Sequence, residues 1–201
     1  MDSTIQNICR DVKLLGKSRD ILDLECVLER NLGGGTLSQR DAGVLLKELR
    51  QTSEYEASVA LLACLWRRSL ELDQFLATTA ISCCGKMHAC SQALCFLRGL
   101  AGDVVNTISY NASITACENG GKWDYALELF REMEHNYMER SIRTYTAAVS
   151  ACEKGEAWAH AYELFCEMAA VRVERNVFTC GAAVSACANG GEWLLALQIF
   201  R

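Results

Sequence analysis

The chain has 201 residues and a formal net charge of −5, with 51% hydrophobic and 22% charged residues. This balance is typical of a folded chain and excludes an intrinsically disordered one. No apolar run reaches the roughly 18 residues that a membrane span needs, and the net negative charge argues against a broad basic surface for duplex DNA. Proline is absent, which suits a nearly all-helical chain because a proline inside a helix costs about 3 kcal/mol.

The N-terminal part predicts a helical pair and then a break. Residues 1–32 carry two apolar stripes at helical spacing, and we interpret them as a divergent pair of helices or a cap. Residues 33–38 form a Gly-rich linker, in which Thr36 or Ser38 can cap the helix that follows. The first fifteen residues show neither a secretory signal nor a typical organelle transit peptide.

A sequence repeat of 35 residues dominates the rest of the chain. One pattern occurs three times, starting at Ser109, Thr144 and Thr179. Its cysteine, tryptophan and phenylalanine positions recur at this spacing: Cys117, Cys152 and Cys187; Trp123, Trp158 and Trp193; Phe130, Phe165 and Phe200. Self-similarity with such a period is typical of a solenoid.

Each copy divides into two amphipathic helices. In the first copy these are expected at roughly 107–119 and 122–136. They are separated by Gly120-Gly121, where glycine suits a left-handed C-terminal cap. The second helix carries an apolar stripe at spacings of three and four residues, which one helical hairpin cannot bury alone.

The repeats predict an all-α fold, a right-handed α-solenoid of stacked antiparallel helix-turn-helix units. Two divergent repeats are expected at 39–73 and 74–106, two clear repeats at 107–141 and 142–176, and a truncated repeat at 177–201. The last repeat ends within its second helix. We therefore expect the chain to be a fragment with both ends incomplete.

Twelve cysteines raise the possibility of disulfides or a metal site. Cys117 and its equivalents lie beside alanines at one repeat position, which is most simply a small core position. The densest group lacks the paired two-residue spacing of a zinc ribbon, so metal binding is the lesser alternative. This group comprises Cys83, Cys84, Cys90, Cys95 and His88. We expect free thiols in a reducing compartment, and no cofactor.

The repeat resembles the pentatricopeptide repeat family. The resemblance is carried by Tyr-Asn-Ala near the start of the first helix, a glycine midway, and Ala-Leu-x-Leu-Phe-x-x-Met in the second helix. The variant Ser-Ala-Cys-x-x-Gly-x-x-Trp at 150–158 is similar to repeats of algae and related protists. The tetratricopeptide repeat has a period of about 34, with its tryptophan early in the first helix. The proline usual near the end of the family's motif is replaced here by Arg140 and Arg175.

This resemblance implies sequence-specific binding of single-stranded RNA, about one base per repeat, read by two or three side chains. It also implies a role in RNA processing, editing or stability, in a mitochondrion or chloroplast. Because no transit peptide is evident, a cytoplasmic location stays open. Protein partners are possible on the convex face, whereas neither a membrane nor duplex DNA is expected as a partner.

The base-reading positions that the resemblance implies occur in pairs. One member follows the aromatic position of the first helix, and the other is the last residue of the same motif. The pairs are Asn111 with Ser141, Thr146 with Asn176, Thr78 with Asn106 and, less clearly, Gly43 with Asp73; Gly181 has no partner. By the family's pairing preferences, Thr with Asn favours adenine and Asn with Ser favours cytosine. The expected track is adenine, cytosine, adenine.

Two further sets of residues are implied for contact with RNA. Three residues before each base reader, the family places a side chain that stacks between bases, which here are Phe75, Ile108, Arg143 and Phe178. For Ile108 and Phe178, burial between repeats is an equally good interpretation. Lys86 and Lys154, near the ends of first helices, are candidates for phosphate contacts or are simply solvated surface.

The acidic residues concentrate on the second helices, for example Asp124, Glu128 and Glu132. The first-helix face is therefore expected to be near neutral, so that affinity for RNA falls only shallowly with salt. A scaffold for protein–protein interaction without RNA binding is the alternative function, because the polar pairs also suit a peptide backbone. No enzymatic activity is expected, since the His-x-Glu and Pro-Cys-x-x-Cys motifs of zinc deaminases are absent from the sequence.

Overall fold

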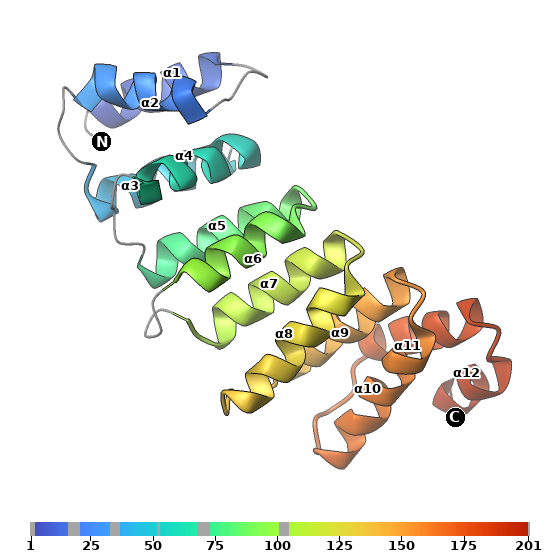
Figure 1. Cartoon of the computed structure of the whole chain (residues 1–201). Coiled ribbons are helices and arrows are strands. Elements are labelled where there is room, and N and C mark those ends of the chain that lie inside the picture. Colours follow the sequence, from blue (N-terminus) through green and yellow to red (C-terminus); the bar gives the residue numbers. More distant parts are fainter. Residues whose placement is uncertain are drawn as a thin grey trace.

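The computed structural model describes residues 3–15, 21–32, 37–51, 53–67, 73–100 and 105–200. These residues form α-helices without a β-strand, and the helices follow one another as antiparallel pairs (Figure 1). The all-α solenoid predicted from the repeat is confirmed. Within the described part, no helix is both long and apolar enough to cross a membrane. The helices are α1 Ser3–Leu14, α2 Ile21–Leu32, α3 Gln39–Gln51, α4 Tyr55–Arg67, α5 Gln74–Lys86, α6 Cys90–Gly99, α7 Thr107–Asn119, α8 Trp123–His135, α9 Ile142–Lys154, α10 Trp158–Ala170, α11 Val177–Asn189 and α12 Trp193–Phe200.

The helices form two layers. The first helix of each pair contacts the first helix of the next, so that α5, α7, α9 and α11 make one continuous layer. The second helices pack on their own partners and on the first helix that follows, as α6 does on α7 and α8 does on α9. Residues spaced by one repeat therefore lie side by side on neighbouring helices, which is how a repeated sequence produces a repeated surface.

The repeated small and apolar positions form the core. Cys117, Cys152 and Cys187 have no exposed surface, as expected for core positions. Along α8 the predicted stripe is buried at Ala126, Leu127, Phe130 and Met133. Burying a large apolar side chain contributes about 1.5–3 kcal/mol, and the stripe of one pair is covered only because the next pair packs on it.

A tryptophan on each second helix packs against a glycine of the following repeat. A Cβ atom added to Gly155 would overlap the indole of Trp123, and one added to Gly190 would overlap the indole of Trp158. Both glycines lie directly after a first helix. The equivalent Trp193 on α12 is 66% exposed. The tryptophan and the glycine thus each recur every 35 residues because the tryptophan of one repeat packs against the glycine of the next.

In the pairs from α3–α4 to α11–α12, the turn inside the pair contains one residue in the left-handed region. The sequence supplies glycine in two repeats, Gly121 with φ +65° and Gly191 with φ +80°. In the first of these, Gly120 has φ −81°, so the second glycine of the expected Gly-Gly cap is the left-handed one. Glu156, with φ +58°, occupies the same turn in the intervening repeat, where a Cβ makes this conformation less favourable.

Arginine takes over the place of the missing proline at the end of the motif. The Arg140 guanidinium lies 4.7 Å from the centre of the Phe130 ring, and that of Arg175 lies 3.9 Å from the centre of the Phe165 ring. A cation over an aromatic face is attracted by the ring. Arg175 also donates to the Phe165 backbone oxygen at 2.8 Å. These contacts fasten the loop to the core of its own repeat.

Hydroxyl groups of two tyrosines join the helices of a pair. The Tyr110 hydroxyl donates to Glu132 Oε1 at 2.8 Å and the Tyr145 hydroxyl donates to Glu167 Oε1 at 2.7 Å. Burial raises the pKa of Tyr110 to about 12, and its hydrogen bond to Glu132 acts in the same direction. Both phenols therefore stay protonated, and stay hydrogen-bond donors, throughout the neutral pH range.

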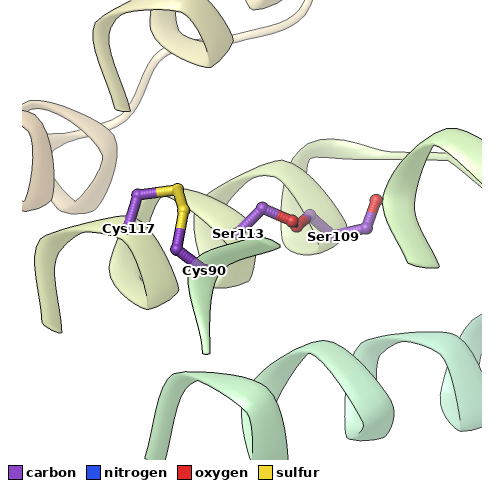
Figure 2. The surroundings of a disulfide bond; sticks show 4 residues. All are labelled: Cys90, Ser109, Ser113 and Cys117. Atoms are coloured by element: carbon purple, nitrogen blue, oxygen red, sulfur yellow. A yellow bond between two sulfur atoms is a disulfide. The ribbon is translucent and has the colours of Figure 1, made fainter. Parts of the chain in front are cut away.

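The expectation that the cysteines are free thiols is corrected for one pair. Cys90 at the start of α6 and Cys117 near the end of α7 form a disulfide, with Cα atoms 4.8 Å apart (Figure 2). The sequence could not reveal this pair, because the contact depends on how one repeat stacks on the next. Among the described residues, no group of three His, Cys, Asp or Glu side chains could hold a metal ion.

Part of the predicted linker can be located. Ser38 caps α3, since its Oγ accepts from the Asp41 backbone N–H at 3.2 Å and donates to Asp41 Oδ2 at 2.6 Å. The alternative cap Thr36 and the glycines at 33–35 lie outside the described residues.

The Trp–Gly contact leads to a prediction of stability. Gly155→Ala forces Trp123 to move and should lower the free energy of unfolding by about 1–3 kcal/mol, the usual cost of overpacking. The midpoint of urea denaturation measures this change. Gly181→Ala is the control, because an added Cβ there meets nothing within 4 Å and alanine favours a helix by roughly 0.5–1 kcal/mol. Equal midpoints for the two variants would contradict the proposed contact.

Candidate nucleic-acid interface

The layer of first helices is hollowed into a groove of about 1000 Å³. Residues of α5, α7, α9 and α11 line it, so the groove crosses four consecutive first helices. Within it, Asn111, Thr146 and Gly181 occupy the same place on α7, α9 and α11. The groove is lined by Ser82, Gly85, Lys86, Ile108, Asn111, Ala112, Thr115, Glu118, Asn119, Ile142, Arg143, Thr146, Ala147, Ser150, Glu153, Asn176, Val177, Phe178, Gly181 and Ala182.

The structure brings most of the implied RNA-contacting residues into this groove. It places there Asn111, Thr146, Asn176, Gly181, Ile108, Arg143, Phe178 and Lys86. Four others do not line it: Ser141, Asn106, Thr78 and Lys154. Phe75 lies in a neighbouring hollow that also reaches Lys86.

The implied stacking residues are exposed. Ile108 is 60% exposed, Phe178 is 78% exposed and Phe75 is 55% exposed. The alternative that Ile108 and Phe178 are core residues between repeats is therefore wrong. Large apolar side chains standing in a groove remain available to a flat ligand, since nothing in the described part of the chain covers them.

A second hollow, of about 600 Å³, adds basic residues that sequence reasoning missed. Lys47, Arg50 and Lys86 line it together with the aromatic rings of Tyr55 and Phe75. Lys47 and Arg50 are one helical turn apart on α3, and this spacing was the available signal. Phe75 is exposed and Tyr55 is partly buried; cations beside an accessible aromatic ring are the combination that nucleic-acid grooves use.

Lys154 is neutralised by an acidic residue that was also missed. Its Nζ lies 2.9 Å from Glu118 Oε1, and the Ser150 hydroxyl donates to the same oxygen at 2.9 Å. Glu118 comes from α7 and lines the groove, whereas Lys154 comes from α9 and does not, so this ion pair joins two repeats beside the groove. Lys154 is therefore not a free cation.

The residues at the motif ends are helix N-caps. Asn106 Oδ1 accepts from the backbone N–H groups of Ile108 and Ser109, at 2.9 and 3.0 Å. Asn176 Oδ1 accepts from the Thr179 backbone N–H at 2.7 Å. Such caps stabilise a helix by about 1 kcal/mol, so a polar residue at this place has a structural reason to recur that is independent of any ligand.

Hydroxyl groups from the following repeat reach the polar groove residues. Thr144 Oγ1 donates to Asn111 Oδ1 at 2.7 Å, and the Thr146 and Thr179 hydroxyl oxygens lie 2.7 Å apart. Thr78 and Thr146 also donate within their own helices, to the Gln74 backbone oxygen at 2.8 Å and to the Ile142 backbone oxygen at 2.7 Å. Thr144 and Thr179 are fully buried; the sequence showed them only as the start of the repeated pattern.

The match to a family model and the similarity to solved structures agree with each other. A family model described as PPR repeat matches residues 108–138 and 143–171. The pentatricopeptide repeat protein PPR10 from maize has a similar structure, with a TM-score of 0.71 and 22% identity over 100% of this chain and 28% of PPR10. This chain thus spans about a quarter of that protein. No curated protein sequence matches significantly.

Two similar structures were solved with RNA. PPR10 in complex with an 18-nt psaJ RNA element matches with a TM-score of 0.60 and 21% identity, over 94% of this chain and 32% of that one. The PPR domain of Arabidopsis thaliana protein-only RNase P 1, in complex with tRNA, matches with a TM-score of 0.61 and 13% identity. It covers 76% of this chain, which spans 83% of the domain. At these identities the similarity establishes the fold.

Proposed function

Residues 108–138 and 143–171 of this chain are pentatricopeptide repeats, and we propose that the protein binds single-stranded RNA along its groove, about one base per repeat. One observation carries the proposal. In successive repeats a polar side chain, Asn111 then Thr146, stands in the groove beside an exposed side chain suited to stacking, Ile108 then Arg143. Structures of the same fold hold RNA, which supports this use of the groove.

The geometry suits bases rather than duplex. An unpaired base offers a flat face for stacking and a polar edge for hydrogen bonds. Here Arg143 and Phe178 offer flat groups and Ile108 offers an apolar contact, at intervals of one repeat, while Asn111 and Thr146 offer polar atoms between them. Stacking on an aromatic ring is worth about 1–3 kcal/mol per base.

The proposal includes an order of bases and a setting. Thr78 with Asn106 and Thr146 with Asn176 are assigned adenine, and Asn111 with Ser141 is assigned cytosine, which gives adenine, cytosine, adenine. The setting is organellar RNA processing, as the family resemblance suggests. Locating a fluorescently tagged protein in mitochondria, chloroplasts or the cytoplasm tests that setting. The chain is assigned a binding role and no catalytic step.

A scaffold for proteins is the second candidate, and one observation favours it. The motif-end residues Asn106 and Asn176 are needed as helix caps, so their recurrence by itself does not require RNA. The exposed apolar side chains of α12, Trp193, Leu194 and Leu197, are a further surface that proteins could contact. Filter binding with mixed-sequence single-stranded RNA separates the two functions.

Removing one stacking ring should weaken RNA binding. Phe178→Ala is expected to lower affinity by roughly 5- to 100-fold, the equivalent of about 1–3 kcal/mol of stacking. Fluorescence anisotropy with a labelled RNA measures it. Tyr125→Ala is the matched control, because Tyr125 is also an exposed ring, 42% accessible, but lies on the second helix α8. An equal loss in both variants would contradict a role for the groove.

Selection from random single-stranded RNA should recover the proposed order of bases. The expected result is enrichment of adenine and cytosine at adjacent positions, because Thr146 and Asn111 stand on neighbouring first helices. Sequencing of the bound pool measures it. A pool without enrichment, or one enriched in pyrimidines alone, would reject the base assignments while leaving non-specific RNA binding open to the anisotropy measurement.

The ion pair between Glu118, which lines the groove, and Lys154 should limit affinity for RNA. Glu118→Gln removes a negative charge and frees Lys154, so affinity should rise roughly 2- to 5-fold at low salt. The plot of log affinity against log salt should steepen by up to about one unit, the effect of one added phosphate contact. Glu128→Gln is the matched control, because it breaks the ion pair with Arg98, 3.0 Å long, on the second-helix layer. A wild-type slope of many ions would contradict binding dominated by stacking and hydrogen bonds.

A further inference from the structure

The side-chain amide of Asn111 is held by a residue of the following repeat. Thr144 Oγ1 donates to Asn111 Oδ1 at 2.7 Å. Thr144 Oγ1 itself accepts from the Ser141 backbone N–H at 3.1 Å. It also lies 3.3 Å from the Ser141 hydroxyl oxygen, which can donate to it while Thr144 donates its own proton to Asn111. Thr144 is completely buried, whereas Asn111 lines the groove. The amide oxygen of Asn111 is thus hydrogen-bonded to the protein, whereas its amide N–H groups are available to a ligand in the groove.

We propose that Thr144 is a positioning residue for base recognition, whose buried hydroxyl fixes the N–H side of the Asn111 amide towards the groove. The inference rests on the proposed binding of RNA. An amide that can turn by half a rotation offers either a donor or an acceptor. Held by Thr144, Asn111 offers donors alone, which suits the bare ring nitrogen of cytosine and opposes the N–H at the same place in uracil.

The next repeat carries the same hydroxyl but does not depend on it. Thr179 lies at the position of Thr144, and its hydroxyl contacts Thr146 at 2.7 Å. Thr146 also donates to the Ile142 backbone oxygen at 2.7 Å, and Asn176 Oδ1 accepts from the Thr179 backbone N–H at 2.7 Å. The Thr179 hydroxyl also donates to Asn176 Oδ1 at 2.8 Å. Thr146 and Asn176 thus each keep a contact with a backbone group when the Thr179 hydroxyl is removed.

The preceding repeat shows that the contact between repeats is not required by the fold. Ser109, which is labelled in Figure 2, occupies on α7 the position that Thr144 occupies on α9. Its hydroxyl donates to the Asn106 backbone oxygen at 2.8 Å, while Thr78 donates within its own helix. Of the three equivalent hydroxyl groups, that of Thr144 is thus the one that donates to a side-chain amide lining the groove. Its removal should change recognition rather than folding.

Two RNAs that differ only in cytosine or uracil at the base opposite the repeat 107–141 test the inference. We expect the full chain to prefer cytosine by roughly tenfold, the size of one good hydrogen bond. In Thr144→Val the two affinities should agree within about twofold. Thr144→Ser keeps the hydroxyl and should restore the preference. Thr179→Val makes the same change at a buried, equivalent threonine and should leave the preference intact.

The inference is overturned if Thr144→Val keeps the preference, or if Thr179→Val loses it equally. Melting curves show whether each variant folds, and Thr144→Ala replaces Thr144→Val if valine is not accommodated. NMR of the Asn111 side-chain amide gives a second reading without RNA. We expect one fixed conformation in the wild type and averaging in the Thr144 variant; an unchanged amide overturns the inference. Failure of the wild type to bind any RNA overturns the proposed function, and the amide reading still decides the role of Thr144.

Discussion

No helical pair of this chain can bury its own apolar stripe, and the rest of the structure follows from that constraint. The stripe on α8 is covered by α9, and the indole of Trp123 fills the space that the absent side chain of Gly155 leaves open. The same contact joins Trp158 to Gly190 one repeat later. Because every pair needs its neighbour, the spacing between pairs is set by close packing, and the first helices are held in register.

This register gives the groove its character. Residues 35 apart on α7 and α9, such as Asn111 and Thr146, line the same groove, as their equivalent places in the repeat predict. A cap at the end of a motif can contribute both to helix stability and to the surface of the groove. Asn176 is the last residue of one repeat, caps the next helix by accepting from the Thr179 backbone N–H, and lines the groove. Stability and recognition therefore act on the same side chain.

The groove is electrostatically mixed. Lys47, Arg50 and Lys86 line the neighbouring hollow at the α3–α5 end, whereas Glu118 of the groove forms an ion pair with Lys154. A ligand that extended from the hollow into the groove would meet cationic side chains first and then polar and apolar ones. Hydrogen bonds that cross between repeats, such as Thr144 to Asn111, then make the chemistry of one repeat depend on the next.

The sequence by itself determined the helical pairs, their period and the two places per repeat where polar residues vary, because apolar spacing and turn residues are local properties of the chain. The bounds of α7 and α8 came out within one residue of the sequence expectation. Only the tertiary structure decided which side chains meet across repeats. The stacking geometry of the repeats sets four features: the Cys90–Cys117 disulfide, the ion pair of Lys154, the exposure of Phe178 and the hydrogen bond from Thr144 to Asn111. Stacking is set by side-chain volumes in neighbouring units, and a pattern read along one chain does not contain that information.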